Sequence, residues 1–502
     1  MTHHPRPNLP LAVLPANPCP DPISAYEKKE KCAVFGVWGA PSPARLAYLA
    51  LYAQQHRGQE SSGIAVSDGD QLAVHTGMGL VPEVFDDRAL RDLEGPHPKA
   101  AIGHNRYSTA GGSLACNAQP LLESYIDGQV AIAHNGNLVN ADALRRVYEE
   151  NGHIFHTHSD TEVVIHLLAS PRQQRSQDPL ATTLRRLQGA FSLIFLFPDR
   201  IEAARDPWGW RPLVLGELPT GQPVVASETV ALDALAANYI REIEPGEIVT
   251  LSDQGVSSRR FADQADRPAH CVFEHVYFAS PASNIFGQTV QTVRERLGEQ
   301  LAREAPVLSG ADFVMPMPDS GRSAASGFAR ASGIPYREGI VPNRYVGRTF
   351  IKPTQDERNA AVRLKLNVIR EIVEGKRVIV VDDSIVRGTT TRAKMEQIRS
   401  AGAKEIHLRI SCPPIRHPCY FGVDFASRDQ LIAHNRSVDQ VREFLGVDSL
   451  AYLSIDGMLS CVATKTRPAA HYCTACYSGD YRIDVEHPHA LDVYEPRQTQ
   501  LF

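Results

Sequence analysis

The chain has 502 residues, of which 43% are hydrophobic and 22% charged, values typical of folded globular proteins. Its 52 Lys and Arg against 57 Asp and Glu leave a net charge of −5, which gives no indication of a nucleic-acid partner. The longest apolar runs, such as Phe191–Phe197, are too short to cross a bilayer, so no membrane insertion is expected. The length predicts about two to four domains.

The nine cysteines are an odd number at irregular spacing. In a long chain this pattern argues against a disulfide framework and favours a reducing compartment. We therefore expect a cytoplasmic protein.

Residues 1–31 are expected to precede the folded part of the chain. Prolines recur at short intervals from Pro5 to Pro22 and interrupt any helical or strand period. They also break the short apolar stretch 9–16, so a secretory signal is a poor fit. The segment is interpreted either as an irregular leader or as a propeptide whose removal makes Cys32 the first residue.

From Cys32 the chain reads Cys-Ala-Val-Phe-Gly-Val-Trp-Gly, a pattern typical of a buried strand. Ser42-Pro43 then supplies an N-cap and a proline at the first helical position, and apolar residues recur at helical spacing towards Gly58. Polar segments follow at residues 57–65, 103–111, 133–138 and 158–162.

Each polar segment by itself has a purely structural explanation. The Asn-Gly pair at 135–136 is a common turn dipeptide. Ser159 and Glu162 can form a capping box, with Asp160 favoured at the positive end of a helix. Arg106 can form a surface ion pair.

The ordered combination of these segments resembles the class II glutamine amidotransferases, which are N-terminal-nucleophile hydrolases with a four-layer αββα fold. The resemblance covers Cys32 to about Glu247, and we expect the domain to span residues 32–265. It implies that Cys32 is the nucleophile. It also implies that the Asn135 side chain and the Gly136 amide form the oxyanion hole, where one donor is typically worth about 2.7–4 kcal/mol of barrier.

A thiol attacks a carboxamide best as the thiolate, so Cys32 needs a base nearby. As the first residue it would use its own α-amino group, which titrates near about 7.7–8.0. This mechanism requires cleavage after Lys31. Cys116 is the alternative nucleophile, but it lies within the chain and has no obvious base. For the substrate, the resemblance implies that Arg106 binds the glutamine α-carboxylate and Asp160 its α-ammonium.

The C-terminal half contains a strand–loop–helix motif. The β-branched run 377–381 is typical of a buried parallel strand, and it leads into the polar loop 382–391 before helical sequence from Arg392. A small polar loop at a helix start is a geometry that cradles phosphate. The upstream segment 312–332 has the same order of strand, polar loop and helix. The two segments together predict an open α/β sheet with its ligand at the carboxyl ends of the strands. The alternative is a Rossmann-like or response-regulator strand whose acid pair only caps the next helix.

The second loop resembles the signature loop of type I phosphoribosyltransferases, and we expect that domain at residues 266–470. In that family two acids contact the ribose hydroxyls and the Mg²⁺ site, the loop after them binds the 5′-phosphate, and a flexible basic loop closes over the pyrophosphate. The resemblance implies one Mg²⁺ per subunit near Ser320, Asp382 and Asp383. The phosphoribosyl pyrophosphate contacts that it implies are Asp382, Asp383, Ser384, Arg387, Gly388, Thr389, Thr390, Arg344, Tyr345 and Arg348.

The two halves together resemble the amidophosphoribosyltransferases. The implied reaction hydrolyses glutamine and adds the ammonia to C1 of phosphoribosyl pyrophosphate, giving 5-phosphoribosylamine and pyrophosphate in the first committed step of purine synthesis. The resemblance also implies feedback inhibition by purine nucleotides and a homo-oligomer, expected to be a tetramer. One departure is Ser280-Pro281-Ala282-Ser283, where the family usually has Arg-Pro-Asp-Ser.

Two alternative functions predict other residues. A different glutamine-dependent transferase, such as a sugar-phosphate-aminating or asparagine-forming enzyme, shares the first half but lacks the loop 382–390. A non-catalytic sensor of the pyrophosphate or of nucleotides would not require the glutaminase residues. Their presence argues against this alternative; they are Cys32, Arg106, Asn135 and Asp160.

The final segment, residues 471–502, contains a CxxC motif at 473–476. On its own the motif fits zinc, a redox pair or no function. Some amidophosphoribosyltransferases hold a [4Fe–4S] cluster that fastens the C-terminal segment, and the resemblance implies one cluster per subunit. Cys412 and Cys461 are rival ligands, and zinc is the rival metal. The implied cluster ligands are Cys271, Cys419, Cys473 and Cys476.

Overall fold

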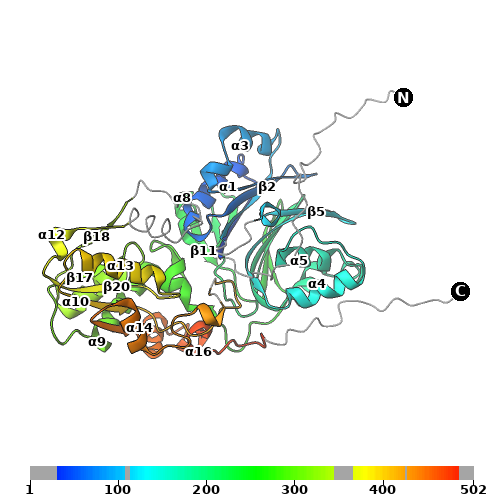
Figure 1. Ribbon diagram of the computed structural model, residues 1–502. Helices are drawn as coiled ribbons and strands as arrows, with labels where there is room; N and C mark the ends of the chain where they lie inside the picture. The colour runs from blue at the N-terminus through cyan, green and yellow to red at the C-terminus, as the bar shows by residue number, and fades with distance from the viewer. Residues whose placement is uncertain (1–30, 108–113, 344–365, 424, 426, 486–502) are drawn as a thin grey trace, which may run out of the picture. The chain divides into compact units, whose positions relative to one another are not determined.

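The structure, a computed structural model, describes residues 31–107, 114–343, 366–423, 425 and 427–485. The chain divides into two compact units, which are described separately (Figure 1). Among the described residues, unit 1 contains those up to Asp266, the segment 420–423 and residues 484–485, and unit 2 contains residues 267–419 with those from 425 to 483. The predicted leader lies almost wholly outside the described residues.

Unit 1 is built on two antiparallel sheets. The strands of the first sheet are β1 (Lys31–Trp38), β2 (Ser61–Ser67), β3 (Leu72–Met78), β4 (Ala100–Tyr107), β9 (Val214–Glu217), β10 (Pro223–Ala226) and β11 (Asn238–Glu242). Those of the second are β5 (Leu121–Tyr125), β6 (Gly128–Leu138), β7 (Gly189–Phe197), β8 (Arg200–Arg205), β12 (Glu247–Ser252) and β13 (Gly255–Arg260). The strand orders are β11-β9-β10-β1-β4-β2-β3 and β13-β12-β8-β7-β6-β5.

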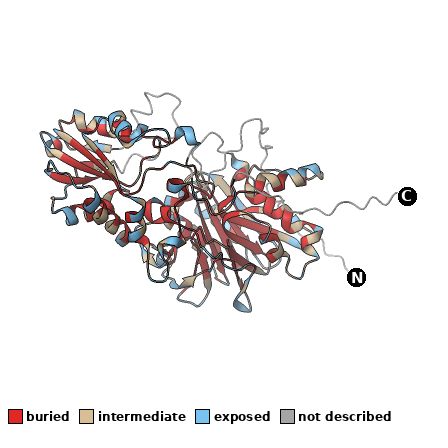
Figure 2. Cartoon of the chain, turned by 90° about the horizontal axis from the view of Figure 1, so that it is seen from below, coloured by how far each residue is buried: buried red, intermediate tan, exposed pale blue. Residues whose placement is uncertain are grey.

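The two sheets pack face to face across an apolar layer. Because side chains alternate along a strand, β1 sends Val34 and Trp38 into this layer, where they meet Ala131 and Ile194 of the second sheet. The alternate residues Phe35 and Val37 point to the outer face of the first sheet and belong to a separate core. Figure 2 shows the buried residues of the chain in red.

Helices cover the outer face of each sheet and complete four layers. The first sheet is covered by α1 (Pro43–Ala53), α2 (Val81–Val84), α3 (Asp87–Glu94) and α8 (Thr229–Ala234). The second is covered by α4 (Ala141–Glu150), α5 (Asp160–Ala169), α6 (Pro171–Gln174) and α7 (Pro179–Leu184). The predicted αββα architecture is confirmed.

Unit 2 contains a parallel sheet of β17 (Phe313–Pro316), β20 (Arg377–Asp382), β21 (Glu405–Ile410) and β22 (Ser449–Tyr452), in that order. Its longer helices are α9 (Val290–Glu304), α10 (Arg322–Ser332), α13 (Thr389–Ser400), α14 (Val438–Leu445) and α15 (Ile455–Val462). The predicted α/β class is confirmed. Helix α13 begins three residues before the expected Arg392, which places Thr389 in its first turn.

Short elements complete unit 2. They are the pairs β14 (His270–Cys271) with β23 (Tyr472–Cys473), β15 (Asn284–Ile285) with β16 (Gln288–Thr289), and β18 (Ile340–Pro342) with β19 (Leu366–Val368), together with α12 (Arg370–Val373) and α16 (Ala475–Ser478). The β14–β23 pair matters for function, because it joins the start of the unit to the CxxC segment.

Candidate functional site

Cys32 is the second residue of β1 and is fully buried. Its partner in the ladder is Arg106 on β4, so the predicted nucleophile and the predicted carboxylate ligand are neighbours. Lys31 continues β1 and pairs with Tyr107. The nitrogen of Cys32 is therefore a peptide nitrogen in this chain, and cleavage would have to break the bond within a strand.

A buried ion pair lies beside Cys32. Arg57 donates from Nε to the carbonyl oxygen of Cys32 at 3.0 Å, and its Nη1 donates to the carboxylate of Glu228. Glu228 is fully buried, and His56 Nε2 lies 3.0 Å from the same carboxylate oxygen. Removing one member would leave a buried charge unpaired, so the pair holds Arg57 against the backbone of the predicted nucleophile. The sequence analysis missed Glu228, because nothing local to it indicates a partner 171 positions away.

Asn135 and Gly136 lie within β6 and not in a turn, so the turn interpretation is wrong. They pair with Ser192 and Phe191 of β7. A Cβ atom at Gly136 would lie 2.0 Å from the carbonyl oxygen of Ala190, so only glycine allows β6 and β7 to approach this closely. Asn135 is 1% exposed and donates from Nδ2 to Ser227 Oγ at 3.3 Å.

Asp160 is the first residue of α5 and is tied to the strand of the predicted oxyanion hole. Its Oδ2 accepts the backbone N–H of Leu138 at 2.8 Å, and its Oδ1 lies 3.3 Å from His134 Nδ1. Both partners are on β6, on either side of Asn135 and Gly136. The predicted ammonium ligand is therefore held at a fixed position relative to the predicted oxyanion hole.

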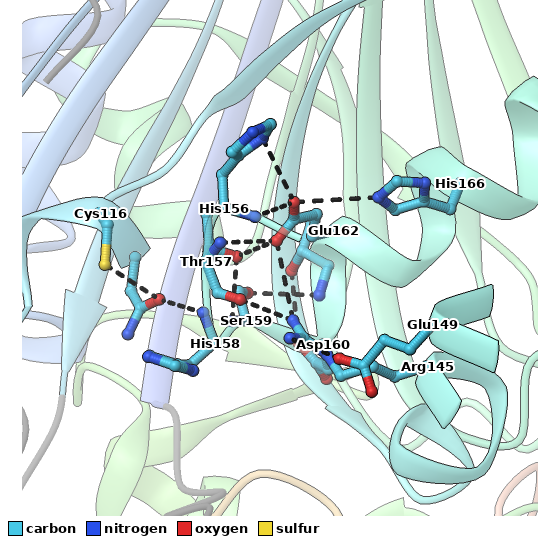
Figure 3. A network of polar contacts seen from close by, with 12 residues as sticks. Cys116, Arg145, Glu149, His156, Thr157, His158, Ser159, Asp160, Glu162 and His166 are labelled. Atoms are coloured by element: carbon cyan, nitrogen blue, oxygen red, sulfur yellow. Dashed lines mark hydrogen bonds and ion pairs between the residues drawn. The ribbon is translucent and has the colours of Figure 1, made fainter. Parts of the chain in front are cut away.

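The loop before α5 is fixed by a network of polar contacts (Figure 3). Ser159 caps the helix by accepting the Thr161 N–H at 3.2 Å. Glu162 does not complete a capping box; its carboxylate accepts the backbone N–H groups of His156 and Thr157 at 2.7 and 2.8 Å. Burial by itself would raise the pKa of Glu162, but hydrogen bonds from His166, His156 and Thr157 outweigh it and lower that pKa.

Arg106 forms an ion pair with Glu60, with 2.8 Å between Nη1 and Oε1. Both side chains are only 7% exposed, so the expected ion pair exists but is buried and not at the surface. Glu60 N–H also donates to the carbonyl oxygen of Arg106 at 2.9 Å. Glu60, the residue before β2, therefore fixes the orientation of the Arg106 guanidinium.

His104 is fully buried near the same strands. Burial lowers the pKa of His104 to about 3, and its Nε2 lies 3.0 Å from the carbonyl oxygen of His134. A group this weakly basic is poorly matched to deprotonating a thiol near neutral pH. Cys116, the alternative nucleophile, lies in the short 3-10 turn Ala115–Asn117, and its sulfur is disulfide-bonded and so is not a free thiol.

In unit 2, Asp382 is the last residue of β20 and Asp383 follows it; both are buried. Burial, and next the charge of Asp383, raise the pKa of Asp382 to about 8. Ser384 donates its hydroxyl to Asp383. The charged form of Asp382 is therefore disfavoured while no cation is bound, a hard divalent cation would favour it, and oxygen is the donor that Mg²⁺ prefers. The donor set therefore fits the implied Mg²⁺.

The loop after the acid pair leads into α13. Gly388 is the N-cap residue with φ +75°, a conformation that side chains rarely adopt, and Arg387, Thr389 and Thr390 are exposed around it. The loop carrying Ser320 lies at the same edge of the sheet, because Met317 N–H donates to the Val381 carbonyl at 2.8 Å. The remaining predicted contacts, Arg344, Tyr345 and Arg348, lie outside the described residues.

The four predicted cluster cysteines come together in unit 2. Cys271 and Cys473 are parallel partners on β14 and β23, and Cys476 follows on α16. The backbone N–H groups of Arg416 and His417 donate to the Cys476 carbonyl, which brings the segment ending at Cys419 to the same place. Burial, and next the charges of Cys419, Cys473 and Cys271, raise the pKa of the Cys476 thiol. The thiolate form of Cys476 is thus disfavoured as long as nothing positive is bound, and a positively charged iron–sulfur core would favour it.

Of the rival cysteines, Cys461 lies away from this group, whereas Cys412 is near enough to Cys476 that its charge also raises the pKa of that thiol. Cys412 Sγ lies 3.3 Å from the Pro413 carbonyl oxygen, and Cys461 Sγ lies 3.4 Å from that of Arg296, as expected for thiols that donate hydrogen bonds. Within the described part of the chain, no three His, Cys, Asp or Glu side chains are grouped so that they could hold a metal ion. The same part of the chain contains no helix long and apolar enough to span a membrane.

Comparisons with known proteins define the class first. Residues 104–234 match the family model described as a glutamine amidotransferase domain. The amidophosphoribosyltransferase of Methanothermobacter thermautotrophicus is 47% identical over 484 residues, which cover 95% of this chain and 99% of the relative. The chain is thus a glutamine amidotransferase whose sequence extends well beyond the amidotransferase domain.

Solved structures agree with this class. One, described as the allosteric regulatory enzyme of purine biosynthesis, is 45% identical with a TM-score of 0.84 and covers 90% of this chain and 97% of its own. The glutamine phosphoribosylpyrophosphate amidotransferase of Bacillus subtilis, complexed with ADP and GMP, is 44% identical with a TM-score of 0.83 and covers 90% and 98%. The chain belongs to the amidophosphoribosyltransferase family, which catalyses the first step of purine synthesis.

Proposed function

We propose that unit 1 hydrolyses glutamine through Cys32 and that unit 2 transfers the ammonia to C1 of phosphoribosyl pyrophosphate. The observation that carries the first half is the convergence of Cys32, Arg106, Asn135, Gly136 and Asp160, which come from four separate elements of unit 1. The products are glutamate, pyrophosphate and 5-phosphoribosylamine. The glutaminase domain is proposed to span residues 32–265, the transferase domain 266–470, and the cysteine-containing segment 471–502.

The glutaminase step begins when cleavage after Lys31 frees the α-amino group of Cys32. That amine takes the thiol proton, and the thiolate adds to the carboxamide carbon of glutamine. The Asn135 side chain and the Gly136 N–H stabilise the negative oxygen of the tetrahedral intermediate, and the amine returns the proton to the leaving ammonia. Water then hydrolyses the thioester and releases glutamate.

Substrate recognition follows from charge. Arg106 binds the α-carboxylate of glutamine and Asp160 its α-ammonium. Glu60, already paired with Arg106, limits the freedom of the guanidinium, so the site is preorganised before glutamine arrives.

In unit 2, Asp382 and Asp383 hold the ribose hydroxyls, and Ser384, Arg387, Gly388, Thr389 and Thr390 bind the 5′-phosphate, with Arg344, Tyr345 and Arg348 closing over the pyrophosphate. One Mg²⁺ per subunit, near Ser320, Asp382 and Asp383, would neutralise the charge of the leaving pyrophosphate. The first turn of α13 supplies backbone N–H groups for the phosphate.

Cys271, Cys419, Cys473 and Cys476 are proposed to bind one [4Fe–4S] cluster per subunit. The group would fasten the C-terminal segment to β14, where Cys271 already pairs with Cys473. We further propose a cytoplasmic homotetramer that is inhibited by purine nucleotides, as the nucleotide-bound relative suggests.

The test combines N-terminal sequencing of the active protein with a Cys32→Ala variant. We expect the active chain to begin at Cys32. We expect the variant to lose glutamine-dependent synthesis while it keeps synthesis from added ammonium, because only the first half-reaction needs the thiol. Cys461→Ala, which removes a buried thiol from unit 2, is the control and should retain both. An active enzyme that still carries its leader, or a glutaminase-active Cys32→Ala variant, would refute the proposal.

A further inference from the structure

Ser227 connects β1 to the strand that carries Asn135. It directly follows β10 and is fully buried. Its backbone N–H donates to the Val34 carbonyl at 3.0 Å, and the Val34 N–H donates to Ser227 Oγ at 3.0 Å. In a regular antiparallel pair the backbone carbonyl of Ser227 would accept that N–H. Here the hydroxyl takes its place, two residues after Cys32.

The same hydroxyl oxygen receives a hydrogen bond from the second sheet. Asn135 Nδ2 donates to it at 3.3 Å. A carboxamide nitrogen has two hydrogens, so one is directed at Ser227 and the other is left for the substrate. Asn135 is 1% exposed, and bulk water is therefore poorly placed to substitute for Ser227.

The orientation of this amide matters for chemistry. An asparagine that rotates by half a turn about its last torsion exchanges Nδ2 for Oδ1 and presents an acceptor where a donor is needed. An oxygen facing the developing oxyanion would repel it, and the stabilising contact would be lost. A fixed partner for Nδ2 prevents this exchange.

We propose that Ser227 is a positioning residue for glutamine hydrolysis, acting through Asn135 by holding its carboxamide with the second Nδ2 hydrogen directed at the oxyanion. The inference rests on the proposed roles of Cys32 and Asn135. Ser227 itself touches no reacting atom.

The first experiment compares two buried serines. Ser227→Ala is expected to lower kcat for glutamine hydrolysis about tenfold, less than the 10²–10³ typical for loss of a whole oxyanion donor, with KM nearly unchanged. Ser192→Ala is the matched control, because Ser192 is fully buried, lies opposite Asn135 on β7, and has its hydroxyl near the carbonyls of Arg211 and Pro212. It should leave kcat within about twofold. Equal losses in the two variants would overturn the inference.

The second experiment is a double-mutant cycle with Asn135→Ala. If Ser227 acts through Asn135, Ser227→Ala costs little further kcat in the Asn135→Ala background. If instead it acts by shifting Val34 and Cys32, the two losses multiply, and the positioning role is refuted. A Cys32→Ala variant that still hydrolyses glutamine would refute the proposed function itself, so the two failures are distinguishable.

Folding of unit 1 is monitored in the same proteins by thermal unfolding, and synthesis from added ammonium reports separately that unit 2 is intact. If Ser227→Ala fails to fold, Ser227→Cys provides the test, because a thiol has a similar size and is a weaker acceptor. A folded Ser227→Cys enzyme with undiminished kcat would also overturn the inference.

Discussion

Trp210 and Phe421 stack with ring centroids 4.3 Å apart and planes inclined by 21°, although they lie in opposite halves of the sequence. The contact is reinforced by backbone acceptors: Arg211 donates to the Phe421 carbonyl, and Asn137 Nδ2 donates to the Tyr420 carbonyl at 2.8 Å. Asn137 is adjacent to Gly136 on β6. The segment 420–423 therefore braces the strand that carries the predicted oxyanion hole.

Phe421→Ala tests this bracing. Phe421 is 3% exposed, and truncating a buried phenylalanine typically costs about 3–5 kcal/mol of unfolding free energy. Because the segment also contacts Asn137, we expect glutamine hydrolysis to fall at least about tenfold, since small displacements of catalytic groups are costly. Thermal unfolding and ammonia release measure the two effects.

Phe425→Ala is the matched control. Phe425 is 2% exposed but belongs to unit 2, where it meets Phe273 edge to face at 4.9 Å. It should destabilise the protein to a similar degree while sparing glutamine hydrolysis by the folded fraction. If both variants lose hydrolysis equally, the bracing has no special role.

Gly136→Ala should be far more damaging than its size suggests. The new methyl group would lie 2.0 Å from the Ala190 carbonyl oxygen, which forces β6 away from β7 and moves the neighbouring Asn135. We expect at least about a hundredfold loss of glutamine hydrolysis. Gly128→Ala, at the other end of β6 with open space around it, should cost about 1–3 kcal/mol of backbone strain, because φ there is +121°, and leave hydrolysis intact. Similar activities in the two variants would contradict the expectation.

The sequence predicts those parts of each site whose signal is local. The acid pair 382–383 follows a β-branched strand and precedes a glycine at a helix start, and each of these features is visible within about ten residues. The strand at Cys32 and the helix after Ser159 are visible in the same way. These elements occur in the structure as predicted, apart from the early start of α13.

Partners that are distant in the chain could not be predicted. Glu228, Glu60 and Ser227 are ordinary polar residues whose neighbours are determined by strand order, and nothing adjacent to them specifies which strand they will meet. The interpretation of the Asn-Gly pair at 135–136 as a turn is wrong for the opposite reason, because there the local signal is clear but misleading. Its local preference for a turn is overridden because β6 is paired along its length with β7.

The pH dependence of unit 1 should include a contribution from Glu162. Hydrogen bonds to its carboxylate outweigh burial and lower its pKa below the ordinary 4.5. A lowered carboxyl pKa gives stability that is present above about pH 4.5 and is lost as the pH falls through the lower folded value. Glu162→Gln should therefore unfold at a lower temperature at pH 7 and show a shallower decline below pH 4.5.

Glu149→Gln is the control for this experiment. Glu149 is 46% exposed and its only described role is an ion pair with Arg145 at 3.8 Å, also drawn in Figure 3. Arg145 also lies 3.7 Å from Glu162, so its charge stays paired when Glu149 is neutralised, and the unfolding curve should stay close to that of the parent at every pH. A Glu162→Gln profile parallel to the parent's would contradict the role assigned to the carboxylate.

The proposed cluster at the cysteine site can be tested by measuring the iron, sulfide and zinc content of the protein. Cys473→Ser should abolish bound iron and acid-labile sulfide together with visible absorbance, because one of four ligands is lost. Cys461→Ser should retain all three, since its thiol lies against the Arg296 carbonyl. Stoichiometric zinc in a colourless parent protein would contradict the cluster and favour a mononuclear site.

The acid pair in unit 2 is expected to lower the stability of the protein while being required for synthesis from ammonium. Asp382 and Asp383 are adjacent and buried, and burial, and next the charge of Asp383, raise the pKa of Asp382 and disfavour its charged form. Asp382→Asn keeps an oxygen that can accept the Asp383 N–H, which lies 3.0 Å from the present carboxylate oxygen, and removes the folding cost of a carboxyl whose pKa is raised in the folded state. In buffer without Mg²⁺ the variant should therefore unfold at a higher temperature than the parent, and yet lose synthesis from ammonium by at least about a hundredfold. Asp319→Asn, which removes an exposed carboxylate paired with Arg322, should change neither quantity appreciably. A less stable Asp382→Asn protein would show that the pair is not under electrostatic strain, and full activity would show that Asp382 does not serve the transfer.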